Sequence, residues 1–384
     1  MKGMSPTNEK NILVIGNGFD LYHGFPTKYS DFINFIKLWD DFYSKYTKNI
    51  SNKEHMANPK YIDLTSYNIN KETMLKLADY YNIYNKTKLD TFDKLIKDND
   101  WINYFKDVCS ETKGWIDFEG EIETIIKCIQ YLFIKCIDPN SDINRPEKFN
   151  NIFTTPQEYF NKTLTYYNPG LYGFILRPVG SELSNIDYNK KIILKTLKKQ
   201  LDDLIDCLNI YLLEFVSKMK PNKQAEDIKN INPFCIISFN YTNTFKEIYK
   251  GYHIIHYIHG KIGDENNMVL GMKDDNMNDD IDFVYFYKYF QRIQKKTGVD
   301  YNKWLSEGSN NIYILGHSLD STDKDVLTKI ITSKNTKQVT LFYRHQKEME
   351  KFIINLLKLF SRDDVIKFTS EEKIIFTKLE KDEL

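Results

Sequence analysis

The feature that most constrains the fold of this chain is a short apolar run that stops at a glycine turn. Residues 11–15 read Asn-Ile-Leu-Val-Ile, and Gly16-Asn17-Gly18 follows at once. Buried parallel strands that end at a phosphate-facing turn have this pattern. From Tyr29 onward, apolar residues recur at helical spacing. The N-terminal segment therefore predicts the first strand and the first long helix of an α/β sheet.

Short apolar runs return in the C-terminal part of the chain, after Pro233. Alternation of such strands with helices predicts a mostly parallel sheet. The predicted strands are residues 234–239, 253–258, 268–270, 312–315 and 339–343. The predicted helices between and after them are residues 282–297, 322–332 and 346–360.

Residues 41–225 differ from both parts, because their apolar residues recur at helical spacing and no strand pattern stands out. The predicted fold class is α/β, with a Rossmann-like, mostly parallel sheet flanked by helices and a large helical insertion after the first strand and helix. Residues 1–40 and 226–384 are predicted to form the core, and residues 41–225 the insertion or lid domain. Within the insertion, the proline-rich residues 139–192 are expected to be least regular.

The charges of this chain balance, with 53 Lys and Arg against 53 Asp and Glu in 384 residues. No overall field attracts nucleic acid, so a nucleic-acid partner is not expected. The five cysteines are scattered without a C-x-x-C pair. This scatter predicts reduced core thiols and no metal site.

Neither end of the sequence predicts export or membrane attachment. The first residues lack the apolar core of a signal peptide, and no later stretch has the roughly 18 apolar residues of a membrane span. We therefore expect a soluble, cytoplasmic protein. Residues 381–384 spell Lys-Asp-Glu-Leu, an endoplasmic-reticulum retention signal that acts only on proteins inside the lumen, and we interpret it as coincidence.

Polar turns follow four of the predicted strands, and in an open α/β sheet such turns meet at the edge where ligands bind. Gly16 and Gly18 allow a sharp turn and the close approach of a pyrophosphate. Asn240 and His259 each stand directly after a strand, where a histidine suits a general base. Taken singly, each turn also fits a helix cap or a tight turn. Together they predict a site for a dinucleotide such as NAD. The residues predicted to bind it are Gly16, Asn17, Gly18, Phe19, Asp20, Gly24, Pro26, Tyr29, Gly316, Ser318, Leu319 and Asp320.

Three segments together resemble the AbiH family of bacterial phage abortive-infection proteins. They are residues 16–29 (GNGFDLYHGFPTKY), 115–119 (WIDFE) and 238–242 (SFNYT). The resemblance covers most of the chain and implies a role in phage defence, with a phage-derived trigger. Residues 115–119 lie in the insertion, where they form either a lid that brings the Glu119 carboxylate over the cleft or a helix start with a solvated Glu119.

The strand-end motifs also resemble, more distantly, the NAD site of sirtuins. The sirtuin patterns G-A-G-x-S-x-x-x-G-I-P, Q-N-I-D, H-G and G-T-S-L are matched in order and spacing by residues 16–26, 239–242, 259–260 and 316–319. Two departures stand out: no cysteine follows Cys235, so no zinc ribbon exists, and Phe239 replaces the sirtuin glutamine. The resemblance therefore implies a zinc-independent NAD hydrolase rather than a deacylase.

The sirtuin resemblance also implies roles for three residues. Asn240 would position the ribose or the attacking water, His259 would be the base, and Asp20 would bind ribose hydroxyls or stabilise positive charge. The alternative is a binding module that senses a nucleotide without turnover. A toxin that acts on RNA or DNA fits the neutral charge less well. Self-association, the trigger, and the choice among NAD, NADP and ADP-ribose stay open.

Overall fold

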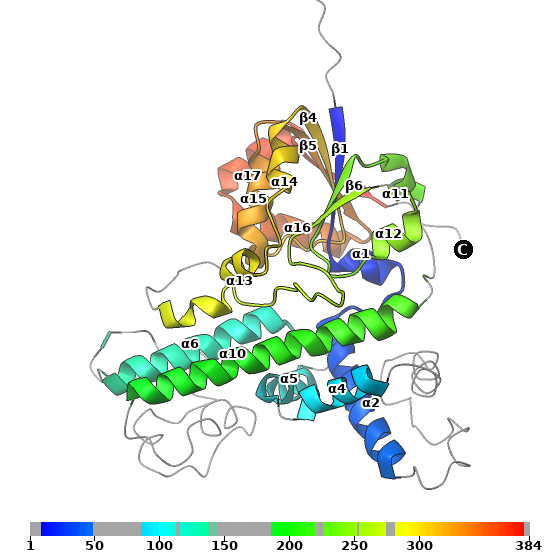
Figure 1. Ribbon diagram of the computed structural model, residues 1–384. Coiled ribbons are helices and arrows are strands. Elements are labelled where there is room, and N and C mark those ends of the chain that lie inside the picture. The colour runs from blue at the N-terminus through cyan, green and yellow to red at the C-terminus, as the bar shows by residue number, and fades with distance from the viewer. Residues whose placement is uncertain are drawn as a thin grey trace, which may run out of the picture. The chain divides into compact units, whose positions relative to one another are not determined.

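The computed structural model describes most of the chain, and the two longest gaps are residues 49–85 and 145–185 (Figure 1). The described residues are 9–48, 86–97, 99–112, 116–137, 141–142, 144, 186–219, 221, 226–251, 253–273 and 281–379. Residues 139–192, expected to be the least regular, lie largely outside these ranges, as do residues 381–384. Within the described ranges, no helix combines the length and the apolar composition needed to cross a lipid bilayer.

The chain divides into two compact units, which we call the sheet unit and the helical unit. The sheet unit comprises Met1–Thr27, Val216–Val269 and Arg292–Leu384. The helical unit comprises Lys28–Phe215 and Leu270–Gln291. Residues 28–40 and 270–291, which the sequence analysis assigned to the core, therefore group with the helices, while residues 216–225 group with the sheet.

The sheet unit contains six parallel strands in the order β3-β2-β1-β4-β5-β6. In chain order the strands are β1 (Glu9–Ile15), β2 (Cys235–Ser238), β3 (Ile254–Tyr257), β4 (Ser309–Leu315), β5 (Thr336–Tyr343) and β6 (Ile374–Lys378). This is the strand order of the Rossmann fold, in which ligands sit where the order reverses, between β1 and β4. The predicted Rossmann-like α/β fold is confirmed.

Side chains of β1 point alternately to the two faces of the sheet and enter two separate cores. Ile12 and Val14 belong to the core covered by α14 (Tyr301–Ser306), α15 (Lys324–Thr332), α16 (Gln346–Leu359) and α17 (Arg362–Ser370). Leu13 and Ile15 belong to the core covered by α1 (Asn17–Tyr22), α11 (Glu226–Ile231) and α12 (Thr244–Tyr249). Because both faces are covered, β1 is buried along its second half, and its carboxyl end is held rigidly at the centre of the sheet.

The helical unit is built on two long helices that run side by side, α6 (Phe118–Ile137) and α10 (Ile186–Ile210) (Figure 1). Its other elements are α2 (Tyr29–Lys48), α4 (Lys86–Lys97), α5 (Asp100–Glu111), the π-helix η3 (Tyr211–Phe215) and the 3₁₀ helix η5 (Ile281–Phe286). Aromatic side chains fill its centre, where Phe35 packs against Phe92, Tyr211 and Phe215. The insertion is thus helical in its described part.

Two predicted elements differ in the structure. Residues 268–270 are buried, as an inner strand would be, but they form no strand of the sheet. Val269 instead donates one hydrogen bond to the His259 carbonyl (2.8 Å). The predicted helix over 282–297 is shorter and divided, because η5 ends at Phe286 and α13 (Lys288–Gln294) begins a new helix.

Candidate functional site

The turns after β1 and β4 lie directly against each other. The Gly18 amide donates to the Gly316 carbonyl (2.7 Å) and the Gly16 amide to the Leu315 carbonyl (3.2 Å). A Cβ on Gly16 would lie 2.6 Å from the His317 Cα, and one on Gly18 would lie 2.8 Å from the Gly316 Cα. The two glycines are therefore required by the packing of one turn on the other. Their contact with a pyrophosphate stays a prediction.

The turn after β4 is conformationally strained. Gly316 and Leu319 both have left-handed backbone, with φ of 69° and 59°, and this region is costly for a leucine. The Leu319 amide donates to His317 Nδ1 (3.0 Å), and Asn355 of α16 donates to the Ser318 carbonyl (2.8 Å). Strain of this kind persists only where surrounding contacts enforce it, and it gathers at functional sites.

Asn240, the residue after β2 predicted to hold a ribose, bonds to the neighbouring turn. Its side-chain amide donates to the Gly16 carbonyl (2.9 Å), and the residue is buried. Its backbone amide is held by the Ser238 hydroxyl (3.2 Å). Asn240 therefore positions the glycine turn.

Asp20 is a buried carboxyl group on α1. It accepts a hydrogen bond from the Thr242 hydroxyl (2.5 Å), and Thr244 donates in turn to Thr242 (3.1 Å). Burial raises the pKa of Asp20 to about 6, although hydrogen bonds from Thr242, Thr244 and Asn240 oppose the rise. Asp20 thus titrates near neutral pH, which is typical of functional carboxyl groups.

The raised pKa of Asp20 makes stability depend on pH. Between its ordinary pKa of 3.8 and about 6, the folded carboxyl holds a proton that the unfolded one has lost. Stability therefore falls as pH rises through this window, by up to about 3 kcal/mol. Urea unfolding of the wild type, measured from pH 4 to pH 8, should show this fall in the free energy of unfolding. In Asp20→Asn, the contribution of residue 20 to this pH dependence should be absent. Asp363→Asn, at an exposed position, is the control and should keep the pH dependence of the wild type. An unchanged pH dependence of stability in Asp20→Asn would contradict the prediction.

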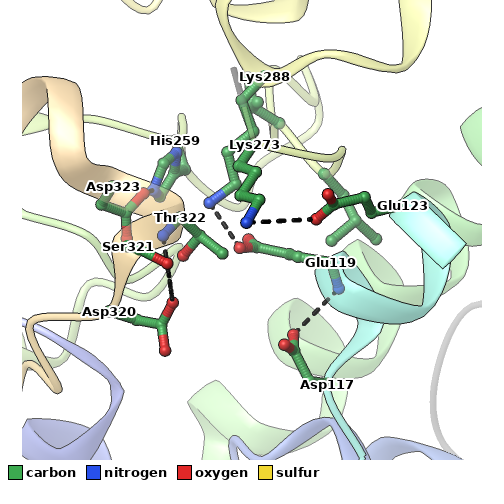
Figure 2. A network of polar contacts seen from close by, with 12 residues as sticks. Asp117, Glu119, Glu123, His259, Lys273, Lys288, Asp320, Ser321, Thr322 and Asp323 are labelled. Atoms are coloured by element: carbon green, nitrogen blue, oxygen red, sulfur yellow. Dashed lines mark hydrogen bonds and ion pairs between the residues drawn. The ribbon is translucent and has the colours of Figure 1, made fainter. Parts of the chain in front are cut away.

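Two histidines flank one carboxylate at the same edge of the sheet. His259 Nε2 lies 2.9 Å from Asp323 Oδ1, and His317 Nε2 lies 3.4 Å from Asp323 Oδ2. Figure 2 shows His259 and Asp323 turned toward each other. All three are buried, and the Phe239 ring lies 4.2 Å from the His317 ring and 5.6 Å from the His259 ring.

The hydrogen bonds at the two histidines fix their tautomers. A carboxylate only accepts, so His259 Nε2 carries a proton that faces Asp323. His317 Nδ1 accepts from the Leu319 amide, so its proton is on Nε2, facing Asp323. Asp323 therefore orients both rings, an arrangement suited to a histidine that acts as a base.

The other predicted dinucleotide-binding residues have varied surroundings. Phe19 is a core residue, with its ring stacked 6.0 Å from that of Phe245. Asn17 accepts a hydrogen bond from the Thr27 hydroxyl (2.5 Å), and Asp320 caps the turn at Thr322 (3.1 Å). Gly24 has left-handed backbone, with φ of 85°. Pro26 follows it in the loop before α2, and Tyr29 belongs to the helical unit, where its ring stacks on Phe118 at 4.2 Å.

Glu119 begins α6 and forms an ion pair inside the helical unit. Its carboxylate lies 2.6 Å from the Lys288 ammonium, and the two side chains are 12% and 1% exposed. Figure 2 shows this pair beside the longer Lys273–Glu123 contact of 3.9 Å and the Asp117 side chain. Glu119 is therefore not a solvated helix start, because a buried lysine needs it as a counter-charge.

A small cleft opens in the sheet unit at the carboxyl ends of β1, β4 and β5. Gly18 and Gly316 form part of its wall, together with Tyr22, Phe342, Arg344 and Glu348. The cleft therefore lies at the point where the strand order reverses, as expected for a ligand site in this fold.

The sequence of this chain matches one protein-family model over most of its length. A family model described as bacteriophage abortive infection AbiH matches residues 12–345, which is more than half of the chain. The chain belongs to the AbiH family. Membership assigns this AbiH-family chain to phage abortive infection and confirms the resemblance predicted from residues 16–29, 115–119 and 238–242. No curated protein is similar enough in sequence to match it.

Sequence reasoning missed two residues of the candidate site in this AbiH-family chain, Asp323 and Arg344. Asp323 stands among Ser, Thr and Asp residues before a helix, where it is indistinguishable from a capping residue. Arg344 follows β5 directly, and the rule that led to Asn240 and His259 applies equally to it. In the described ranges, no group of three or more His, Cys, Asp or Glu residues is arranged to hold a metal ion.

Proposed function

We propose that this AbiH-family chain hydrolyses the bond between nicotinamide and ribose in NAD during phage infection, which depletes the host of NAD. The observation that carries the proposal is the His259–Asp323 pair, in which a buried carboxylate orients an imidazole just after β3. The strand order, which is that of dinucleotide-binding Rossmann sheets, supports a nucleotide as the ligand.

In the proposed reaction, water attacks C1′ of the ribose as the bond to nicotinamide breaks. His259 Nδ1 takes the proton from the water, Asp323 stabilises the imidazolium that forms, and nicotinamide leaves with the bonding electrons. The products are nicotinamide, ADP-ribose and one proton. The ionised carboxylate of Asp20 offsets the positive charge that develops on the ribose.

The proposal is tested by product release. The purified full chain is incubated with NAD, with and without extract of phage-infected cells, and nicotinamide and ADP-ribose are measured by chromatography. We expect the two products in equal amounts, and a faster reaction with infected extract. If no condition releases nicotinamide although ADP-ribose binds, the chain is not a hydrolase.

A second candidate function, a nucleotide sensor without turnover, is favoured by one specific observation. The Gly18 amide and the Asn240 side chain, both expected to face the ligand, bond to the protein backbone instead. In a sensor, ligand binding would separate the two turns and so report on a nucleotide. Binding of ADP-ribose without nicotinamide release from NAD is the result that this candidate requires.

A further inference from the structure

His317 is the second histidine of the candidate site, and both of its ring nitrogens face groups of the protein. Nδ1 accepts a hydrogen bond from the Leu319 amide (3.0 Å), and Nε2 lies 3.4 Å from Asp323 Oδ2. The side chain is buried. An imidazole has no third nitrogen with which to take a proton from water. His317 is therefore not a second base.

The Asp323 carboxylate is shared between the two imidazoles, with one ring at each oxygen. Oδ1 lies 2.9 Å from His259 Nε2, and Oδ2 faces the proton on His317 Nε2. The torsion that turns a carboxylate about its own bond is soft, so a contact at one oxygen does not fix its plane, whereas contacts at both oxygens do. Because Asp323 orients His259, the group that holds Oδ2 also affects the base.

His317 is itself held by the turn after β4 and by an aromatic ring. Leu319, whose amide it accepts, is fully buried in a left-handed conformation with φ of 59°. On another side, the ring of Phe239 lies 4.2 Å from the imidazole. The strained turn is thus linked through His317 to Asp323, and through Asp323 to His259.

We propose that His317 is a positioning residue, which fixes the Asp323 carboxylate and so keeps His259 in the orientation that accepts a proton from water. The inference rests on the proposed function for the reaction itself. It adds that the turn after β4 contributes to the chemical step through the His317 ring.

Two substitutions separate the roles of the two nitrogens of His317. The side-chain oxygen of asparagine lies the same number of bonds from Cα as Nδ1 of histidine, and the amide nitrogen of glutamine the same number as Nε2. His317→Asn therefore keeps an acceptor for the Leu319 amide and loses the donor that faces Asp323. His317→Gln keeps the donor and loses the acceptor.

The expected results for the two variants differ in rate and in stability. In His317→Asn, kcat for nicotinamide release should fall by about 10- to 100-fold with KM unchanged, because the base is misplaced while the substrate still binds. His317→Gln should be at least about fivefold faster than His317→Asn, although its midpoint in urea unfolding should be lower. A purely structural role predicts the opposite order of rates, since the rates would then follow stability. His345→Asn, at an exposed histidine, is the control and should keep the wild-type kcat.

Magnetic resonance of isotope-labelled histidine gives a readout that does not depend on turnover. In the wild type, Nε2 of His259 should carry the proton, and in His317→Asn and Asp323→Asn the proton should be distributed over both ring nitrogens. An unchanged His259 signal in His317→Asn, a wild-type rate in that variant, or a slower rate in His317→Gln overturns the inference and leaves the proposed function standing. If the wild type releases no nicotinamide, the proposed function fails, and the His259 signal alone decides whether His317 positions that ring.

Discussion

His259→Ala is expected to lower the rate of nicotinamide release by about 10²- to 10⁴-fold, the usual cost of losing a positioned base. Its ADP-ribose affinity should change little, because the imidazole acts at the reacting carbon. Phage protection in cells should be lost together with turnover. Product chromatography, calorimetric titration and plaque counts measure the three quantities on the same variant.

Asp323→Asn tests whether the carboxylate acts through the imidazole. If Asp323 only orients His259, this variant should also be slow, and the double variant should be no slower than His259→Ala alone. His253→Ala, at a partly buried histidine outside the site, is the matched control and should keep full activity. Additive losses in the double variant would show that Asp323 has a separate role, and full activity of His259→Ala would refute the assignment of the base.

Gly316→Ala is expected to destabilise the fold by more than about 3 kcal/mol. A Cβ at this position would lie 2.1 Å from the Phe19 amide nitrogen, which is backbone, and the residue has φ of 69°. Neither the contact nor the backbone angle can relax unless the turns after β1 and β4 move apart. In urea unfolding, the midpoint should shift to a lower urea concentration, while the dependence of the free energy of unfolding on urea concentration should stay unchanged.

Gly263→Ala is the matched control for that variant, because a Cβ there would meet no heavy atom within 4 Å. Its stability should lie within about 0.5 kcal/mol of the wild type, as at an ordinary surface position. Equal stability of the two variants would mean that the turns after β1 and β4 are not locked together as described.

The central part of the fold followed from sequence because its signals were local. The run before Gly16 predicted β1, and the apolar run before Asn240 predicted β2, since each stops abruptly at a turn. β6 was missed because its apolar run, residues 374–376, is short and is followed at once by Thr377 and Lys378. Residues 268–270 were wrongly predicted as a strand because burial alone does not distinguish a strand from an extended loop.

Sequence placed the candidate site more reliably than it explained it. His259 was found because a histidine directly after a strand is conspicuous. Its partner Asp323 lies 64 residues further along the chain and was not found, because only the folded chain brings the two residues together. Gly16 and Gly18 stand out in the sequence as a turn after a strand. The crowding that requires glycine at both positions comes from residues 316–317, and no local pattern reveals that contact.

The insertion between β1 and the rest of the sheet delays the moment at which the sheet is complete. β1 lies between β2 and β4, and Ile15 pairs with Ser238 on one side and with Leu315 on the other. At 5–20 residues per second, a ribosome needs roughly 15–60 s to make the roughly 300 residues that separate Ile15 from Leu315. Throughout that interval the first strand has no complete sheet to join, and the His259–Asp323 pair does not exist. The candidate site is thus absent for as long as the chain is being made.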